Sequence, residues 1–320
     1  MKRYSYFPVN SHNNEIRILN IFPGRRGYPI CCSLTNTSIG SFGYTALSYT
    51  WGSTETIQLI EIYEDSQKYS LAVTDNLYEA LDHIRSQNTT QSLWVDAICI
   101  NQADTGERNC QVRLMRQIYS SASRLLIWLG KASEDSDSAM RLFRACSEPD
   151  YRLQVRQLSI DDSSAITALF GRPWFKRLWT RQEVRVSTPE LCQIQCGDFT
   201  LGLSAIMWFR QKWFQSVISE GVGVTLDERK VIEYVTVTEA LSNLVSCIPK
   251  DFPHGNEVNS LGYWLEASVK AQTTDPRDHV FAVLGMTDYV GEQDLLIDYS
   301  KSVAAVFAET IIFDISRSGN

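Results

Sequence analysis

The sequence predicts an α/β protein with a central, mainly parallel sheet flanked by helices. Three short apolar runs, at 44–49, 93–100 and 124–129, end in turn-forming residues, as strands buried on both faces do. Amphipathic helical patterns separate these runs, and strands that alternate with helices indicate a parallel sheet. The loops that leave the strands would share one edge of the sheet, where open α/β sheets bind their ligands.

Before and after the first core strand the sequence predicts short strands and a hairpin. Residues 15–19 alternate polar and apolar side chains, which is typical of an edge strand, and 31–34 form another short strand. The segments 56–63 and 69–73 flank a polar turn and predict a hairpin.

Helices are predicted where apolar residues recur at helical spacing. One helix begins at Thr74 or Asp75 and buries a stripe of four side chains, Leu77, Ala80, Leu81 and Ile84. Another follows Asp104, and Glu107 three residues later resembles a capping box. A third helix covers about 133–146.

The second half of the chain is mostly helical. A helix at 163–170 precedes a segment in which Pro173 suits a first helical turn, and 191–196 reads as a fourth core strand. Further helices are expected at 204–218, 235–247, 262–270, 279–284 and 302–315. We therefore expect an α/β domain over 1–200 and a largely helical extension over 201–320 packed on it. The last helical pattern ends close to residue 320, which leaves open whether the chain is a fragment of a longer protein.

Composition excludes several classes of protein. The net charge of −7 over 320 residues argues against a nucleic-acid binder, which needs clustered Lys and Arg. No apolar stretch approaches the ~18 residues of a membrane span, and the start lacks the apolar core of a signal peptide. The eight cysteines are scattered without a C-x-x-C pair, so we expect buried free thiols in a reducing cytosol and no metal site.

Three common catalytic motifs are absent from the sequence. It lacks the P-loop motif, a G-x-G-x-x-G after a strand, and the G-x-S-x-G nucleophile elbow. These absences argue against a P-loop NTPase, a Rossmann dehydrogenase and an α/β-hydrolase.

Several sequence blocks, in this order, resemble the HET (heterokaryon incompatibility) domain of filamentous fungi. The first two read Tyr-Thr-Ala-Leu-Ser-Tyr-Thr-Trp-Gly and Leu-Trp-Val-Asp-Ala-Ile-Cys-Ile-Asn-Gln, and a third begins Arg-Pro-Trp-Phe-Lys-Arg-Leu-Trp. The matching blocks cover 44–52, 93–102, 107–112, 118–130 and 172–184, with a thinner match at 275–285.

This resemblance implies a cytosolic protein of fungal non-self recognition that triggers programmed cell death. It also implies distant kinship to TIR domains, which have a flavodoxin-like fold and act as assembly modules or as enzymes that cleave NAD between nicotinamide and ribose. Ser48 and Tyr49 before Trp51 and Gly52 are similar to the first TIR strand and its loop. The spacing of Trp179 and Glu183 is similar to that around the catalytic glutamate of TIR enzymes, although Thr180 stands where the commoner plant form has Cys.

One carboxylate is enough for this reaction, and Glu183 is the catalytic candidate. Nicotinamide leaves as a neutral pyridine without a general acid, so the enzyme must mainly stabilise the oxocarbenium-like ribose. The alternative is a surface glutamate paired with Arg172, Arg181 or Arg185. NAD would be a substrate, and no resident cofactor is expected.

Each candidate for substrate binding also has a structural explanation. Trp51 can form an aromatic wall or fill the core, and Ser48 or Tyr49 can orient a ribose or be ordinary strand residues. Arg172 can meet a phosphate or pair with a carboxylate. Asp96 is expected to be structural, tied to a backbone N–H or to Arg172. The full set of binding candidates is Ser48, Tyr49, Trp51, Gly52, Asn101, Gln102, Arg172 and Trp179.

Asn101 and Gln102 stand at the end of a strand, where turn capping and ligand contact are equally open. Asp275, Arg277 and Asp278 are expected to cap the helix that follows.

Two functions remain. The chain is an NAD-cleaving enzyme that becomes active on self-association, or a non-enzymatic death module that signals through its own assembly or a partner protein.

Overall fold

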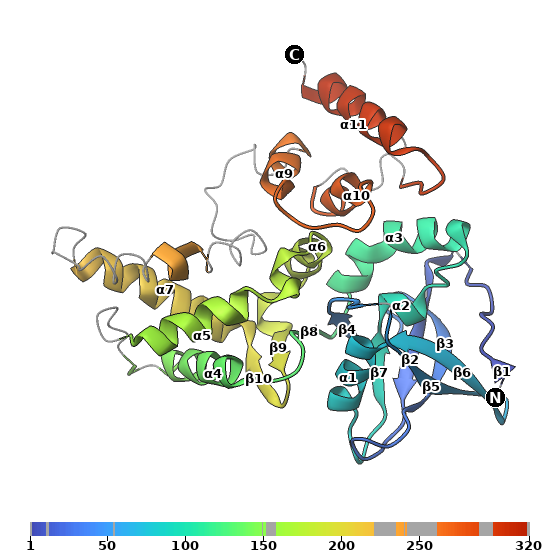
Figure 1. Cartoon of the computed structure of the whole chain (residues 1–320). Helices are drawn as coiled ribbons and strands as arrows, with labels where there is room; N and C mark the ends of the chain where they lie inside the picture. Colours follow the sequence, from blue (N-terminus) through green and yellow to red (C-terminus); the bar gives the residue numbers. More distant parts are fainter. Residues whose placement is uncertain are drawn as a thin grey trace.

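The computed structural model describes residues 2–10, 13–53, 55–148, 150–151, 158–220, 235–239, 241, 261–287 and 297–318. In this part of the chain ten strands form one sheet, in the order β1-β6-β5-β3-β2-β7-β4-β8-β9-β10, with helices around it (Figure 1). The predicted α/β class is therefore confirmed.

The parallel centre of the sheet is built from the predicted apolar runs. β7 (Gln91–Trp94), β4 (Thr45–Ser48), β8 (Arg124–Trp128) and β9 (Cys192–Cys196) run in one direction. β10 (Phe199–Gly202) pairs antiparallel with β9 and ends the sheet. Most side chains of these central strands are buried, as expected for strands that are covered on both faces.

The other half of the sheet is mixed. β2 (Glu15–Ile21) pairs antiparallel with both β3 (Cys31–Ser38) and β7. β5 (Ile57–Glu64) and β6 (Gln67–Thr74) form the predicted hairpin. β1 (Lys2–Arg3) runs parallel to β6, and β3 runs parallel to β5.

The prediction of an edge strand at 15–19 is wrong. β2 lies inside the sheet, and its polar member Arg17 is only 1% exposed. The alternating pattern predicted an exposed face wrongly, because Arg17 has a buried carboxylate partner, Glu107, on a helix far along the chain. A polar residue with a buried ion pair has the same sequence pattern as one that faces water.

The prediction of a continuous strand over 93–100 is also wrong. β7 ends at Trp94, and α2 (Asp96–Cys99) makes one helical turn. The Asp96 carboxylate accepts a hydrogen bond from the Ala97 N–H at 2.7 Å, and the Cys99 N–H bonds to the Val95 carbonyl at 2.7 Å. Ile98 and Cys99 are buried in either conformation, so their apolar character does not distinguish strand from helix.

The predicted helices and caps largely agree with the structure. α1 (Asp75–Ile84) is capped by Thr74, and α4 (Glu134–Cys146) by Ser133. α3 (Thr105–Ser120) is capped by the Asp104 side chain, but Glu107 pairs with Arg17 and does not complete a capping box. α5 (Ile160–Phe170) follows.

The segment that opens with Pro173 forms two separate helical pieces. These are the 3-10 helix η3 (Pro173–Lys176) and α6 (Trp179–Val186), which are separated by the extended residue Arg177. The 3-10 turn η4 (Pro189–Leu191) then leads into β9.

Of the helices that follow β10, α7 (Leu203–Glu220) lies beside α4 and α5 (Figure 1). α9 (Leu261–Ser268) and α10 (Asp278–Leu284) lie next to each other and near α6, and α11 (Val303–Ser318) lies beyond α10. Arg116 of α3 donates to the Thr287 carbonyl at 2.6 Å, and Arg181 of α6 donates to the Ala267 carbonyl at 2.8 Å. Residues 235–239 are helical, and most of the helix predicted over 235–247 lies outside the described residues.

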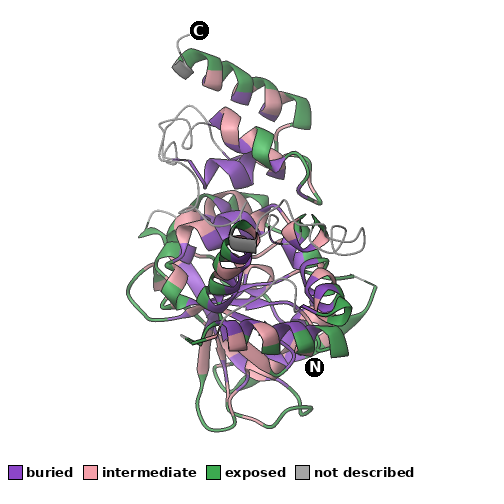
Figure 2. Cartoon of the chain, turned by 90° about the vertical axis from the view of Figure 1, so that its left-hand side faces the viewer, coloured by how far each residue is buried: buried purple, intermediate pink, exposed green. Residues whose placement is uncertain are grey.

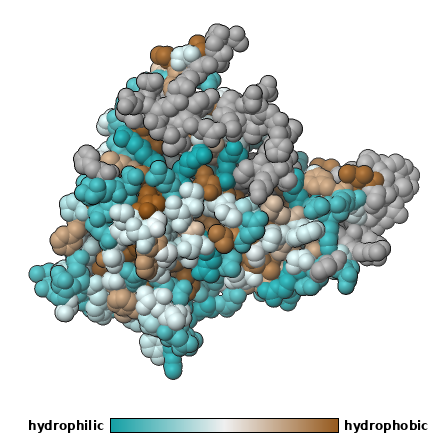
Figure 3. Space-filling model, turned by 180° about the vertical axis from the view of Figure 1, so that it is seen from behind, coloured by the Kyte–Doolittle hydropathy of each residue, from teal (hydrophilic) through white to brown (hydrophobic). Residues whose placement is uncertain are grey.

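Buried residues are concentrated in the sheet and on the inner faces of the helices, whereas α11 is mostly exposed or half-buried (Figure 2). Seen from behind, hydrophilic and apolar residues are intermixed on the surface (Figure 3). In the described ranges no helix combines the length and the apolarity that a membrane crossing requires. The cysteines in these ranges are free thiols.

Candidate active site

Glu183 is buried at the carboxyl edge of the parallel strands. It projects from α6 and is 3% exposed, so the alternative of a surface glutamate is wrong. Its electrostatic and hydrogen-bonding neighbours are Ser48 at the end of β4, Tyr119 of α3, and Arg177 between η3 and α6. Four separate chain segments thus meet at this carboxyl group.

Burial raises the pKa of Glu183 to about 7. The Arg177 charge lowers this pKa, as do hydrogen bonds with Ser48 and Tyr119, and the negative charge of Asp96 raises it. One carboxylate oxygen, Oε2, is buried without a hydrogen-bond partner. The group therefore changes charge near neutral pH and keeps one oxygen free for another interaction.

The hydroxyl of Ser48 is fixed by a tryptophan. Trp174 Nε1 of η3 donates to Ser48 Oγ at 2.8 Å, and both side chains are buried. Because the serine oxygen accepts this bond, its own proton remains available for Glu183.

The extended backbone at Arg177 separates η3 from α6, and the Arg177 guanidinium donates to the Tyr49 carbonyl.

A second carboxylate, Asp96, lies at the start of α2 and joins the loop after β4. Trp51 Nε1 donates to Asp96 Oδ2 at 2.8 Å, while Asp96 Oδ1 accepts from the Ala97 N–H. Burial, followed by the Asp96 charge, raises the pKa of Tyr49 well above its usual value. Asp96 is thus held by a backbone N–H, as predicted, and by Trp51, whereas Arg172 bonds to carbonyls of the loop after β8.

The loop that carries Trp51 and Gly52 is held by α1. Gly52 has φ +76°, and a Cβ there would approach Asn76 Cβ to 3.1 Å, so glycine suits this position. Asn76 Nδ2 donates to the Thr50 carbonyl at 2.6 Å, and Asn76 Oδ1 accepts from Trp128 Nε1 at 3.1 Å. The Trp51 ring is 38% exposed, so it reaches the surface and is not a core side chain.

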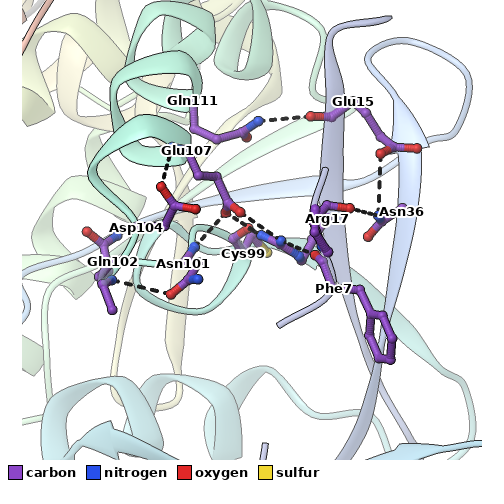
Figure 4. A network of polar contacts seen from close by, with 12 residues as sticks. Phe7, Glu15, Arg17, Asn36, Cys99, Asn101, Gln102, Asp104, Glu107 and Gln111 are labelled. Atoms are coloured by element: carbon purple, nitrogen blue, oxygen red, sulfur yellow. Dashed lines mark hydrogen bonds and ion pairs between the residues drawn. The ribbon is translucent and has the colours of Figure 1, made fainter. Parts of the chain in front are cut away.

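Asn101 and Gln102 support this edge of the sheet through local bonds. Gln102 Nε2 donates to the Asp96 carbonyl at 3.0 Å, and Asn101 Oδ1 accepts from the Ala103 N–H at 3.3 Å. The Asn101 N–H donates to Glu107 Oε1 at 2.7 Å, which places the turn next to the buried pair with Arg17 (Figure 4). Local hydrogen bonds of this kind are typical of turn capping, one of the two roles considered for Asn101 and Gln102.

Arg172 contacts the loop after β8, and Trp179 contacts Asp278 of α10. Arg172 donates to the carbonyls of Leu129 at 2.8 Å and Lys131 at 2.9 Å, so it fixes the loop after β8 and does not pair with a carboxylate there. Trp179 is half-buried, and hydrogen bonding from it lowers the pKa of Asp278.

Arg277 is the N-cap residue of α10 but makes no capping bond through its side chain, and Asp278 is the first residue of this helix. Asp275 forms an ion pair with Arg277 and accepts its N–H, while Asp278 accepts from the Tyr299 hydroxyl at 2.6 Å.

Sequence reasoning missed Arg177 and Asn76. Arg177 is one of four arginines between 172 and 185, and only the break between η3 and α6 brings it to Glu183. The link between Tyr119 and this site was also missed. Within the described residues no group of His, Cys, Asp and Glu is suited to hold a metal ion.

Comparison with known proteins gives a family match. Residues 44–183 match the family model described as "Heterokaryon incompatibility protein (HET)". The chain is 28% identical over 364 residues to "Heterokaryon incompatibility protein 6, OR allele" of Neurospora crassa, an alignment that covers 96% of this chain and 52% of the relative. The chain therefore spans about half the length of the curated relative it matches. No solved structure matches it.

Proposed function

Because residues 44–183 match the heterokaryon incompatibility (HET) family model, we propose that the chain is a cytosolic effector of fungal incompatibility that cleaves NAD through Glu183. The named relative supports the incompatibility role. The observation that carries the enzymatic part is the buried Glu183 carboxyl, with a pKa of about 7 and a free Oε2, at the carboxyl edge of the sheet. A perturbed, buried carboxyl in such a position is typical of functional sites.

The chemistry needs Glu183 in its ionised form. As the bond between ribose C1′ and the nicotinamide nitrogen breaks, its electron pair leaves with nicotinamide, and positive charge develops on the ribose. An ionised carboxylate in a water-poor site stabilises that charge strongly. Water then forms the new bond to C1′ and releases its proton to solvent. Ser48 would help to orient the ribose, and the Trp51 ring would stack on the nicotinamide or adenine.

Access to Glu183 requires a change in the loop after β4. Glu183 is 3% exposed, while Trp51 of this loop is 38% exposed and held by its bond to Asp96. Displacement of Trp51 would open a path from the surface to the edge of the sheet. We infer that self-association, with a second copy or an incompatibility partner against this loop, supplies the displacement and keeps a single chain silent.

The test is the release of nicotinamide from NAD by the purified chain at increasing protein concentration. We expect release to rise more steeply than in proportion to concentration and to disappear in Glu183→Gln, which keeps the side-chain volume. Glu190→Gln, an exposed position close in sequence, is the matched control and should retain activity. Release that is undiminished in folded Glu183→Gln, or absent at every concentration, would refute the enzymatic proposal.

The second candidate is a non-enzymatic death module. It is favoured by the closed state of Glu183, whose neighbours Ser48, Tyr119 and Arg177 suit a purely structural carboxyl. Expression in a fungal host separates the two functions. If folded Glu183→Gln still kills cells as the wild type does, the signal comes from assembly or a partner protein and not from NAD cleavage.

A further inference from the structure

A polar cavity of about 410 Å³ lies against β8, β9 and the end of α1. Its walls come from the starts of β7 and β8, from β9 and β10, and from the end of α1. Its polar lining includes Arg26, His83, Arg124, Gln193, Gln195 and Asp198. This volume is within the range of small-molecule sites and would hold roughly a dozen waters.

Arg124 supplies a positive charge that lacks a neighbouring carboxylate. Its guanidinium is half-buried and donates to two neutral oxygens, Gln193 Oε1 at 3.2 Å and Thr45 Oγ1 at 3.3 Å. Burial lowers the pKa of Arg124, and no charged group among the described residues offsets this effect. A buried charge without a counter-charge is unfavourable, so an incoming anion would be stabilised here.

The rest of the lining suits the polar body of a ligand. The only acidic lining residue, Asp198, forms an ion pair with Arg26, so the lining keeps one net positive charge in a chain of charge −7. Gln195 Nε2 bonds to the Gly197 carbonyl at 3.0 Å, which leaves its Oε1 as an acceptor. His83 Nδ1 is bonded to the Glu79 carbonyl at 2.8 Å, so Nε2 is its other polar atom.

We propose that this cavity binds a small, hydroxylated metabolite that carries a phosphate or carboxylate group. The Arg124 fork matches the oxygens of either anion, and the glutamine amides match hydroxyl groups. The cavity is larger than a lone inorganic anion requires. It stands apart from the Glu183 edge, because Arg124 begins β8 while Ser48 ends the neighbouring parallel strand β4.

Calorimetry with three probes of one carbon skeleton tests the proposal on the full chain. Glucose 6-phosphate or gluconate should bind, and neutral glucose should bind much more weakly; comparing the first two shows which anion is preferred. Arg124→Gln should weaken binding roughly tenfold or more, because a charge-assisted fork is lost. Arg141→Gln, which removes a mostly exposed arginine, should leave binding unchanged.

A second variant keeps the test decisive if Arg124→Gln fails to fold. Gln193→Glu places a carboxylate on the partner of Arg124, so it should raise the melting temperature and abolish binding of the anion. Equal binding of glucose, no binding by any of the three probes, or unchanged anion binding in Gln193→Glu would overturn the proposal.

Discussion

Trp51 Nε1 donates a hydrogen bond of 2.8 Å to Asp96 Oδ2 and so joins the loop after β4 to the first residue of α2. The bond connects the exposed aromatic ring to the electrostatic environment of Glu183, since the Asp96 charge raises the pKa of that carboxyl. Asp96 is therefore a shared neighbour of the surface loop and of the buried carboxyl group.

Asp96→Asn should lower the pKa of Glu183 below about 7, because it removes a negative charge that disfavours ionisation. Arg177→Gln should shift the same pKa upward, because it removes a favourable positive charge. The Glu183 carboxyl can be followed by carbon NMR of glutamate-labelled protein, with Glu183→Gln to assign the signal. Trp51→Phe breaks the hydrogen bond but keeps the Asp96 charge, so it should not reproduce the fall. Identical titrations in wild type and Asp96→Asn would contradict this electrostatic link.

The parallel centre of this fold was predictable, because continuous apolar runs between turn residues have few alternatives to buried strands. The caps at Thr74 and Ser133 were also accessible, since capping depends on residues close in sequence. The turn at Asp96 was not, because a strand and one helical turn bury the same apolar side chains. Contacts with residues distant in sequence decide between a strand and a helical turn in such cases.

The candidate site was predictable only in part. The fold brings Glu183, Ser48 and Tyr49 close together, but no feature of the sequence distinguishes Arg177 from its neighbouring arginines. Arg172 was chosen because an arginine fork matches a phosphate or a carboxylate, but the fold directs it to carbonyls of the loop after β8. Charged residues that act across the fold leave no periodic signal in the sequence.

Glu183→Gln should stabilise the folded chain at alkaline pH. The folded pKa of about 7 lies above the ordinary 4.5, so the folded state binds the proton more tightly than the unfolded chain. Ionisation of Glu183 therefore does not lower the free energy of unfolding below pH 4.5. The loss of stability grows as the pH rises through 7, to about 3 kcal/mol. Urea unfolding of wild type and Glu183→Gln from pH 5 to 8.5 should show this widening gap. The exposed Glu266→Gln should show none, and a constant gap for Glu183→Gln would disprove the prediction.

Glu107→Ala should destabilise the fold by about 3–5 kcal/mol, because it leaves a buried guanidinium without its carboxylate. Arg17 Nη2 bonds to Glu107 Oε2 at 2.9 Å, and Arg17 Nη1 bonds to the Cys99 carbonyl at 3.0 Å (Figure 4). Glu107 also accepts the Asn101 N–H, so the turn before α3 should loosen as well. Urea unfolding gives the loss, and hydrogen exchange reports the turn.

The double variant Arg17→Met with Glu107→Leu is the control for this pair. It removes both charges together, so it should recover much of the stability lost in Glu107→Ala. Glu309→Ala, which breaks the more exposed pair with Lys301, should cost less than about 1 kcal/mol. A similar small loss for Glu107→Ala would mean that water replaces the buried carboxylate.

Gly285→Ala should weaken the packing of α10 on α6. A Cβ at Gly285 would lie 2.2 Å from Gln182 Nε2, and Gln182 is 1% exposed, so its side chain has little room to move. Overpacking of this kind typically costs about 1–3 kcal/mol, and the strain falls on the residue next to Glu183. Thermal unfolding should give the loss, and hydrogen exchange should rise in α6 and α10.

Gly262→Ala is the control, because its Cβ meets Asp314 at an ordinary 3.4 Å and alanine favours the helix α9. Adding Gln182→Ala should relieve the clash and restore much of the stability; failure of this rescue would show that the backbone, and not the Gln182 side chain, excludes a larger residue at 285.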